Sequence, residues 1–206
     1  MASGLVSRRW QSILIFEFWE REGQELFNAC AMLDPQGEMI AHYRKITTAG
    51  EYEITPGSAL KPFDTPLGKV GFLLCSDRAA DNLRTLAVQG AGVVFVPMDG
   101  AGGPENTDKM RWRARENGCW IAIANTWSSV LINPQGGLHL EKYETECVSV
   151  QVLPVPQENR ASLAARRSDL YGPLTQAGGD GALYDTAGKL TKAALAEREQ
   201  GRKRAA

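Results

Sequence analysis

A cysteine that follows an apolar run is the residue of this sequence whose type and position most clearly allow chemistry. The run Val70–Leu74 is short, contains β-branched and aromatic side chains, and is preceded by Pro66-Leu67-Gly68. This pattern predicts a buried strand rather than a helix. Cys75 comes directly after it, at the strand end where α/β sheets place ligands, and a helix that starts nearby would favour the nucleophilic thiolate. The alternative is a buried, inert cysteine.

Few other side chains could assist a nucleophilic thiol. The chain has two histidines, and a dyad of His42 with Cys75 stays open, because the sequence does not fix the direction of the His42 side chain. Lys45 ends a predicted strand, where a lysine can stabilise a developing oxyanion. Glu51 and Glu53 follow it. Taken alone, each of these three charged residues is more simply an exposed surface side chain.

The elements around Cys75 form a strand–helix–strand unit. Residues 81–90 show the apolar spacing of a helix, and Val93–Pro97 forms a second apolar strand after a Gly-Ala-Gly stop. The glycine-rich segment Met98–Pro104 is a candidate active-site loop, and Asn106–Asn117 is predicted as a second helix. This arrangement indicates an α/β fold with Cys75 at its centre.

Two antiparallel meanders flank this unit, and turn residues such as Asp34-Pro35-Gln36-Gly37 separate their strands. Residues 1–9 are expected to be unstructured or strongly context-dependent, and Thr47–Pro66 to be an irregular loop. The predicted strands are Trp10–Trp19, Leu26–Leu33 and Met39–Ile46 in the first meander, and Trp120–Thr126, Ser128–Asn133, Leu138–Tyr143 and Cys147–Leu153 in the second. Short helices are predicted over Ala161–Arg167 and, as a basic and weakly amphipathic tail, over Ala187–Arg204.

Composition excludes several classes of function. The 206 residues are 43% hydrophobic, enough for one domain with a real core, and the net charge of -1 gives no electrostatic reason to expect nucleic acid or an anionic membrane. No apolar run is long enough to span a bilayer, and the first residues lack the apolar core of a secretion signal. The four cysteines are scattered, without zinc-site spacing or a disulfide framework. A cytoplasmic protein is expected.

The chain carries a series of short motifs whose order and spacing are more specific than any one motif. They are Tyr43-Arg44-Lys45-Ile46, Glu51 with Pro56-Gly57, Thr65-Pro66-Leu67-Gly68-Lys69-Val70-Gly71, Leu74-Cys75-Ser76-Asp77, Leu86–Ala91, Val96-Pro97, Arg113–Asn117, Ala124-Asn125 and Arg166–Tyr171. Together, over residues 16–174, they resemble the nitrilase superfamily, the carbon–nitrogen hydrolases. The resemblance implies an α/β fold, the α-β-β-α sandwich of that family, which commonly pairs across subunits. A homo-oligomer, a dimer or larger, is therefore expected.

The resemblance also implies an activity. Members hydrolyse non-peptide C–N bonds of small amides, N-carbamoyl compounds or nitriles through a cysteine thioester or thioimidate, without a metal or an organic cofactor. By position, Cys75 resembles the nucleophile. Lys45 and the backbone N–H of Ser76 resemble the groups that stabilise the tetrahedral intermediate. Glu51 resembles the second glutamate, which supports the lysine and the substrate, and Glu53 stays open as an alternative.

Two departures from the family pattern concern the general base and the pocket. The family's general-base glutamate lies on an early strand, before the segment that resembles Phe16–Leu33. The chain is therefore expected to lack this glutamate and the first strand–helix portion of the sandwich, because the glutamates at positions 17, 20 and 22 do not match it. The family also has an aromatic residue after the cysteine and a Phe-Pro-Glu soon afterwards. Here Ser76 and Ala80-Asp81-Asn82 occupy these places, so a smaller or more polar pocket is expected.

The sequence thus divides into an atypical segment over residues 1–15, an incomplete carbon–nitrogen hydrolase domain over 16–174, and a tail with a helix over 175–206. It predicts a hydrolase that acts through a Cys75 thioester. The alternative is a catalytically inactive, truncated member that acts as an oligomer subunit or has no activity. Acyl transfer to an acceptor other than water is a third option. A missing first strand would leave an open sheet edge and favour association.

Overall fold

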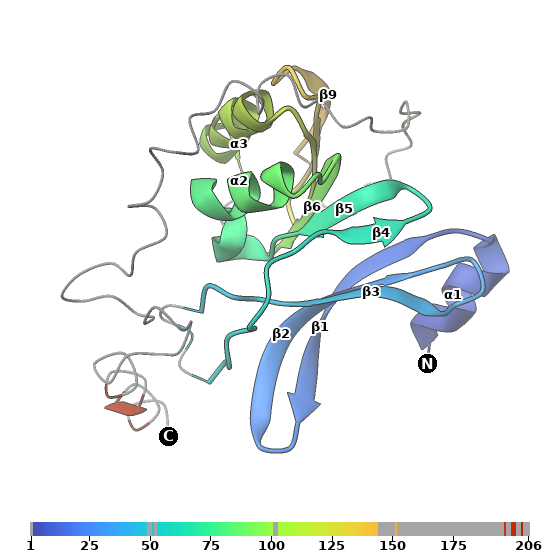
Figure 1. Ribbon diagram of the computed structural model, residues 1–206, viewed down its shortest axis with the longest axis vertical. Coiled ribbons are helices and arrows are strands. Elements are labelled where there is room, and N and C mark those ends of the chain that lie inside the picture. Colours follow the sequence, from blue (N-terminus) through green and yellow to red (C-terminus); the bar gives the residue numbers. More distant parts are fainter. Residues whose placement is uncertain are drawn as a thin grey trace.

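The computed structural model describes residues 2–48, 51, 53–100 and 103–143, together with the single positions 151, 196, 199, 200 and 203. The described residues form two sheets and a layer of helices (Figure 1). Helix α1 (Ala2–Trp10) begins the chain and lies at the end of the smaller sheet. The mixed α/β class that the sequence predicts is confirmed.

The smaller sheet is an antiparallel meander of three strands in the order β1-β2-β3. Strand β1 (Leu14–Glu22) is only half-buried, whereas seven consecutive residues of β2 (Glu25–Leu33) are buried, from Phe27 to its end. Strand β3 (Met39–Arg44) stops one residue before Lys45. The predicted first meander is therefore present, and its last strand delivers Lys45 to the end of the sheet.

The larger sheet has six strands in sequence order, and its two central pairings, β5 with β6 and β6 with β7, are parallel. The other pairings are antiparallel. Its strands are β4 (Phe63–Thr65), β5 (Gly68–Phe72), β6 (Val93–Met98), β7 (Trp120–Asn125), β8 (Ser128–Ile132) and β9 (Leu138–Lys142).

The strand–helix–strand unit predicted around Cys75 is confirmed as β5, helix α2 (Ala80–Val88) and β6. Gly71 in β5 is required by the packing of this unit, because a Cβ atom there would lie 2.8 Å from Cδ1 of Leu86 on α2. Helix α3 (Pro104–Asn117) then connects β6 to β7 and ends at Gly118, which has a φ of 64°. A left-handed residue at that position is the usual way to end a helix.

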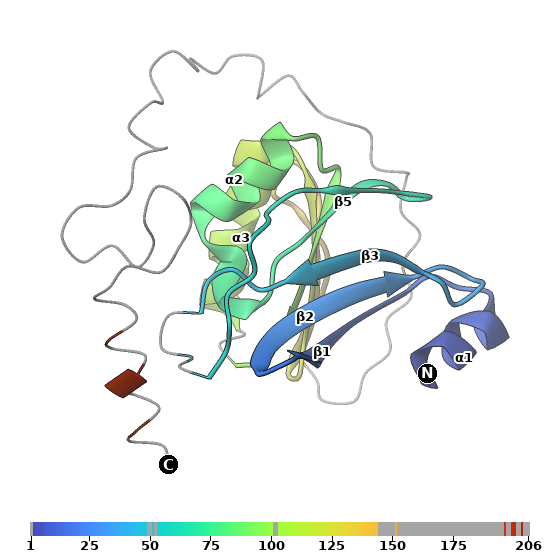
Figure 2. The ribbon, with the colours of Figure 1, turned by 60° about the horizontal axis from the view of Figure 1, so that its bottom comes forward.

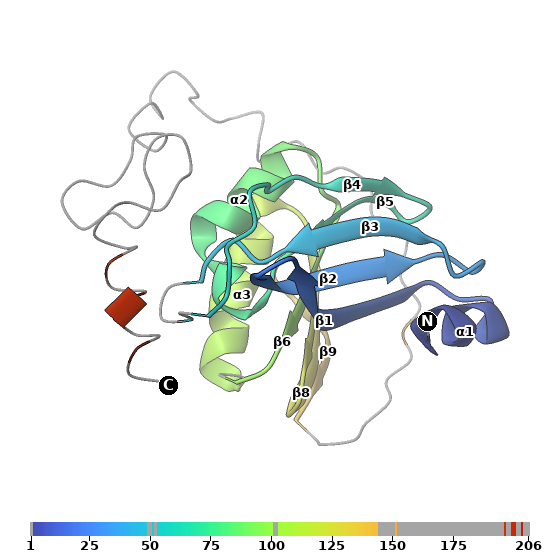
Figure 3. The ribbon, with the colours of Figure 1, turned by 90° about the horizontal axis from the view of Figure 1, so that it is seen from below.

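Two apolar cores hold the layers together, and Figure 3 shows the sheets and helices edge-on. One core lies between the sheets and joins Cys30, Met32 and Tyr43 to Phe72 and Leu74. The other core fills the space between the six-stranded sheet and helices α2 and α3. The described residues thus form a β-β-α sandwich, in which each layer buries the apolar face of its neighbour.

Several sequence predictions need correction. Residues 2–10, expected to be unstructured or strongly context-dependent, are helical, and the first strand starts at Leu14 rather than Trp10. The polar residues Gln11 and Ser12 separate the two elements, and a hydrogen bond from the Ser12 amide to the Ser7 carbonyl closes the helix. The loop before β5 also contains the short strand β4. The predicted strand at 147–153 and helix at 161–167 lie outside the described residues, apart from position 151, which is not in a strand. The four described positions of the predicted tail helix are helical.

The outer face of the smaller sheet carries a polar network rather than a catalytic group. His42 contacts Glu20 at 2.9 Å, and Arg44 binds the same carboxylate at 2.6 Å (Nη2 to Oε1) while it covers the ring of Phe27. Figure 2 shows this sheet with α1 at its end. Arg44 is the main reason why the pKa of Glu20 is lowered from its ordinary value. His42 is therefore engaged away from Cys75, and the open possibility of a Cys–His dyad is not met.

Candidate active site

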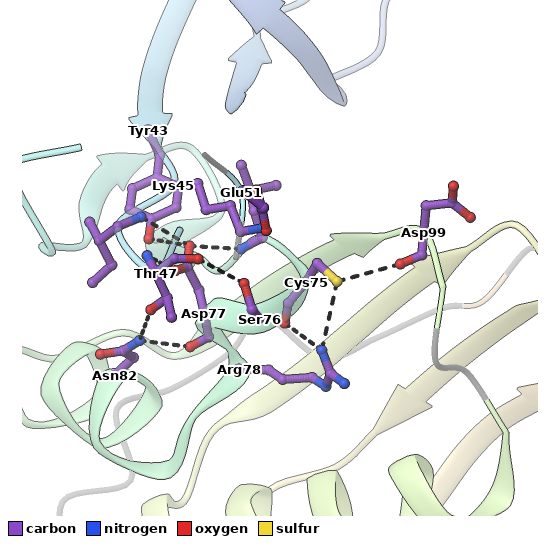
Figure 4. A network of polar contacts seen from close by, with 12 residues as sticks. Tyr43, Lys45, Thr47, Glu51, Cys75, Ser76, Asp77, Arg78, Asn82 and Asp99 are labelled. Carbon is purple, nitrogen blue, oxygen red and sulfur yellow. Dashed lines mark hydrogen bonds and ion pairs between the residues drawn. The ribbon is translucent and has the colours of Figure 1, made fainter. Parts of the chain in front are cut away.

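Cys75 lies at the carboxyl end of β5, where the chain leaves the sheet. The amide of Leu73 still donates to the carbonyl of Phe95 at 3.1 Å, and Cys75 then begins the 3₁₀ helix η1 (Cys75–Arg78). Cys75 has a φ of +45°, a left-handed conformation that non-glycine residues rarely adopt. Such local strain is found mainly at functional sites, and here it turns the sulfur toward the carbonyl of Asp99, 3.4 Å away. Figure 4 shows this turn.

The partial exposure of Cys75 distinguishes it from the other two described cysteines. Cys30 and Cys119 are buried in the two cores, and burial raises the pKa of each thiol to about 12. Such thiols stay protonated at neutral pH and are poor nucleophiles. Cys75 is the described cysteine that solvent and reagents can reach.

Lys45 is a buried cation with one carboxylate partner. It follows β3 directly, where its amide donates to the carbonyl of Asn28 at 2.8 Å. Lys45 is 2% exposed. Its Nζ contacts the carboxylate of Glu51, whose side chain is 32% exposed. Glu53 is exposed and does not share this contact. The structure therefore brings Glu51, rather than Glu53, to Lys45.

A short hydrogen-bonded loop holds Glu51 in place. The amide of Glu51 donates to the carbonyl of Thr48 at 2.9 Å, and the amide of Gly57 donates to the carbonyl of Lys45 at 2.7 Å. Gly57 packs against the main chain of Arg44, so closely that a Cβ atom would lie 2.9 Å from its carbonyl carbon. Glycine is therefore needed for the loop to fold back onto β3.

Replacing Gly57 with alanine should force this loop away from β3. We expect the free energy of unfolding to fall by about 1–3 kcal/mol, the usual cost of overpacking. The measurement is urea denaturation of the variant beside the wild-type chain, with Gly4→Ala as the control, because a Cβ atom at Gly4 would make only an ordinary contact, 3.5 Å from the carbonyl oxygen of Gly37. Equal midpoints for wild type and Gly57→Ala would show that the loop moves freely and does not hold Glu51.

Asp77 ties the Lys45 segment to the Cys75 turn. Its side chain is fully buried and accepts hydrogen bonds from the Tyr43 hydroxyl at 2.7 Å, the Thr47 amide at 2.6 Å and the Leu74 amide at 3.3 Å. Tyr43 and Thr47 flank Lys45, as Figure 4 shows, and Leu74 precedes Cys75. One carboxylate thus fixes both chain segments relative to each other.

Ser76 completes the connection. Its hydroxyl donates to the carbonyl of Thr47 at 2.8 Å, which fixes the first turn of η1 against the end of β3. Amides in the first turn of a helix have no intrahelical acceptor. The Ser76 amide is therefore suited to donate to an oxyanion that forms at the carbon attacked by Cys75.

The pH dependence of stability should reveal the burial of Asp77. Burial raises the pKa of its carboxyl above the ordinary value of 3.8, although the hydrogen bonds from Tyr43 and Thr47 oppose the rise. An acid whose pKa is higher in the folded chain stabilises the fold below its unfolded pKa, and this contribution is lost as pH rises through the folded pKa. We expect the stability of wild type relative to Asp77→Asn to decrease as pH rises from 3.8. Urea denaturation at a series of pH values measures it, and parallel profiles would contradict it.

The resemblance selects Cys75, Lys45, Glu51 and Ser76, which the structure brings into one region, but it does not select the residues that join them. Asp77 was part of a quoted motif without a role. The position of Asp77 in the sequence, between a buried strand and an apolar helix, indicates burial. A buried carboxylate is costly unless it is hydrogen-bonded, so a structural role could be expected. Its partners Tyr43 and Thr47 could not be found this way, since they lie some 30 positions away in sequence.

Two further observations concern the described residues. They contain no group of three or more His, Cys, Asp or Glu side chains arranged to hold a metal ion. None of the helices within this part of the chain is both long and apolar enough to cross a membrane.

Solved structures share this architecture. A carbon–nitrogen hydrolase from Helicobacter pylori superposes with a TM-score of 0.71 at 19% identity, over 84% of this chain and 74% of that one. An amidase variant from Nesterenkonia in complex with butyramide gives 0.68 at 24% identity, over 82% and 69%. These likenesses show the fold, that of the carbon–nitrogen hydrolases.

Sequence comparison gives the family. The human omega-amidase is 28% identical over 184 residues, 74% of this chain and 66% of the relative. A nitrilase and fragile histidine triad fusion protein of Drosophila melanogaster is 28% identical over 187 residues, 74% of this chain but 40% of the relative. The model of the Carbon-nitrogen hydrolase family matches residues 4–160, and the chain belongs to this family. The predicted membership of the nitrilase superfamily is confirmed.

Proposed function

We propose that this protein hydrolyses non-peptide C–N bonds of small amides or N-carbamoyl compounds, and of nitriles as a further class, through a thioester on Cys75. The observation that carries the proposal is the buried Lys45–Glu51 pair, which Asp77 and Ser76 fasten to the Cys75 turn. A buried lysine is rare unless it is paired or functional. The family of this chain, and the relatives that are named as amidases, support the same chemistry.

Each residue takes one role in this proposal. The Cys75 thiolate attacks the carbonyl carbon, and the negative charge on the carbonyl oxygen is stabilised by Lys45 and the Ser76 amide. The intermediate collapses with loss of the C–N bond, and the nitrogen leaves as ammonia after it accepts a proton. Water then attacks the thioester, which releases the carboxylic acid and restores the thiol. Glu51 holds the lysine in place and exchanges protons with the leaving nitrogen.

A second candidate function, that of an inactive family member, follows if Cys75 has no general base. No carboxylate of the described residues hydrogen-bonds to the Cys75 sulfur, whose partners among these residues are the Asp99 carbonyl and the Arg78 guanidinium. We propose, as the alternative to full turnover, that the described residues supply no general base for the hydrolysis of the thioester. In that case Cys75 is acylated but the thioester is hydrolysed slowly, and the protein acts as an inactive family member or an oligomer subunit.

Association and compartment are proposals as well. Strand β1 is paired on one side within the described residues, and Trp19 on it is 63% exposed. An open edge beside an exposed aromatic side chain favours a homo-oligomer, a dimer or larger. Cys30, Cys75 and Cys119 are all free thiols, which supports a reducing, cytoplasmic setting.

Ammonia release from a panel of small amides, N-carbamoyl amino acids and nitriles tests the proposal. We expect turnover by the wild-type chain and none by Cys75→Ser, while both give the same urea midpoint. Release that continues in Cys75→Ser would exclude the thioester route. A folded wild-type chain that releases no ammonia would leave the inactive family member as the function.

A further inference from the structure

A buried amide oxygen without a hydrogen-bond partner lies on the strand next to Lys45. Among the described residues, the buried side-chain oxygens and nitrogens without such a partner are Oδ1 of Asn28 and Oδ1 of Asn117. Asn28 belongs to β2 and is 7% exposed, so solvent scarcely reaches it. A buried acceptor that stays unsatisfied costs stability, and its presence calls for an explanation. The chemistry proposed above uses neither amide.

Strand pairing places the side chains of Asn28 and Lys45 next to each other. The Lys45 amide donates to the Asn28 carbonyl at 2.8 Å, which continues the ladder of β2 and β3 past the end of β3. Opposite residues of an antiparallel ladder share a face, with Cβ atoms about 4.5–5.5 Å apart. Two residues further along the ladder, Cys30 and Tyr43 form such a pair in the core between the sheets. Because side chains alternate along a strand, Asn28 and Lys45 face the same way, toward the sheet whose strand β5 leads to Cys75.

The Lys45 ammonium group has a hydrogen available for this oxygen. An ammonium group has three N–H donors. Within the described part of the chain, its acceptor is the carboxylate of Glu51, and the oxyanion of the proposed mechanism takes a second hydrogen. The third hydrogen lies in a site where Lys45 is 2% exposed. The Asn28 oxygen is an unpaired acceptor on the same face of the same sheet, so the two groups are complementary.

A neutral acceptor suits this position better than a second carboxylate. In the proposed mechanism Glu51 exchanges protons with the leaving nitrogen, and it loses its negative charge whenever it carries a proton. An amide oxygen is not protonated near neutral pH, so Asn28 can hold the ammonium group through this step. It also leaves the positive charge of Lys45 available to the oxyanion, whereas a second carboxylate would offset that charge.

We propose that Asn28 is a positioning residue for Lys45, whose ammonium group donates a hydrogen bond to the Asn28 side-chain oxygen when it turns from Glu51 toward the oxyanion. The inference rests on the proposed function, because it assigns Asn28 to the oxyanion site of that reaction. Asn28 does not touch the substrate and acts through Lys45.

Replacing Asn28 with leucine removes the acceptor. In single-turnover experiments with butyramide, we expect acylation of Cys75 to slow about 10- to 100-fold, the range for a hydrogen bond to a charged group. The butyramide concentration that gives half of the maximal rate should not change, because Asn28 does not bind the substrate. The urea midpoint should not fall, since the variant removes an unsatisfied polar atom. Asn117→Leu is the matched control, because it removes the other unpaired amide oxygen, on α3, and should acylate at the wild-type rate.

A double variant tests whether Asn28 acts through Lys45. In the Lys45→Met background, Asn28→Leu should cause no further loss of acylation rate. Losses that add would mean that the two residues act independently, and would overturn the positioning role. Asn28→Val is a second apolar variant, with a side chain that favours strands. If neither Asn28→Leu nor Asn28→Val folds, the amide serves the fold and the positioning role is also overturned.

Butyraldehyde provides a test that needs no hydrolysis. The Cys75 sulfur forms a bond to the aldehyde carbon, the C=O double bond becomes a single bond, and the thiol proton passes to the oxygen or to water. The reversible adduct is tetrahedral, like the intermediate of the proposed reaction. Protection of Cys75 from iodoacetamide measures its dissociation constant. We expect Asn28→Leu to weaken the adduct about 10- to 100-fold, and Asn117→Leu to leave it unchanged.

The outcomes separate this inference from the proposed function. Acylation by butyramide at the wild-type rate in a folded Asn28→Leu chain would overturn the inference and leave the proposed function intact. An aldehyde adduct that weakens in Asn28→Leu, and no further when Lys45→Met is already present, would support the inference. If butyramide does not acylate that same chain, the proposed function is contradicted while the inference stands. A folded wild-type chain that forms neither adduct would overturn both.

Discussion

Replacing Glu51 with glutamine is expected to lower the free energy of unfolding by about 3 kcal/mol. The reason is that Lys45 is 2% exposed and would be left buried without its carboxylate partner. Removing one member of a buried ion pair costs about 3–5 kcal/mol. The lower end applies here, because the Glu51 side chain is 32% exposed and water reaches the pair. Urea denaturation with a fixed slope measures the change.

A double variant makes this prediction specific to the pair. Lys45→Met with Glu51→Gln removes both charges, so most of the lost stability should return although activity does not. Glu116→Gln is the surface control, since its pair with Arg84 is open to solvent and should contribute no more than about 1 kcal/mol. If the double variant is as unstable as Glu51→Gln alone, the loss comes from the loop and not from an unpaired lysine.

Replacing Lys45 with methionine is expected to slow acylation of Cys75 by amides about 100- to 1000-fold, the usual effect of removing one oxyanion donor. Methionine preserves most of the volume and apolar contacts of the lysine stem. Glu51, which is partly exposed, can be hydrated after the change, so the fold should persist. The measurement is the single-turnover rate of acyl-enzyme formation by rapid quench and mass spectrometry.

Alkylation of Cys75 by iodoacetamide provides the control for Lys45→Met. This reaction develops no oxyanion, so its maximal rate across a pH profile should stay within a few-fold of the wild-type rate. A parallel loss of alkylation and acylation would mean that Lys45 acts on the thiol itself or on the fold. An unchanged acylation rate would show that Lys45 has no part in oxyanion stabilisation.

Local sequence patterns predicted the centre of the fold well, because burial controls it. The apolar runs at 70–74 and 93–97 form central parallel strands, and the helix between them follows the same apolar spacing. Helix α1 is not positioned by burial, because its apolar residues Leu5, Val6 and Trp10 are exposed. It is held instead by contacts such as the bond from the Ser7 hydroxyl to the Ser12 carbonyl, 2.7 Å. Such contacts depend on neighbours that a local pattern does not reveal.

For the candidate site, too, some features could be predicted from the sequence and others only from the structure. The resemblance to a family supplied Cys75, Lys45 and Glu51, and the structure adds that two of them are in contact. Their positions could not be derived from spacing, because Lys45 and Cys75 lie on different sheets and meet through Asp77. Long-range hydrogen bonds to a buried carboxylate depend on how the two sheets pack, which sequence periodicity does not report.

The central claim is that Cys75 is a nucleophile held opposite an oxyanion site. Intact-protein mass spectrometry after incubation with small amides, N-carbamoyl amino acids and nitriles tests it most directly, with Cys75→Ala beside the wild-type chain. We predict a substrate-dependent mass increase equal to the acyl group, present in the wild type and absent in the variant, with or without release of product. A folded wild-type chain that gains no mass and forms no product from any of these compounds would contradict the claim.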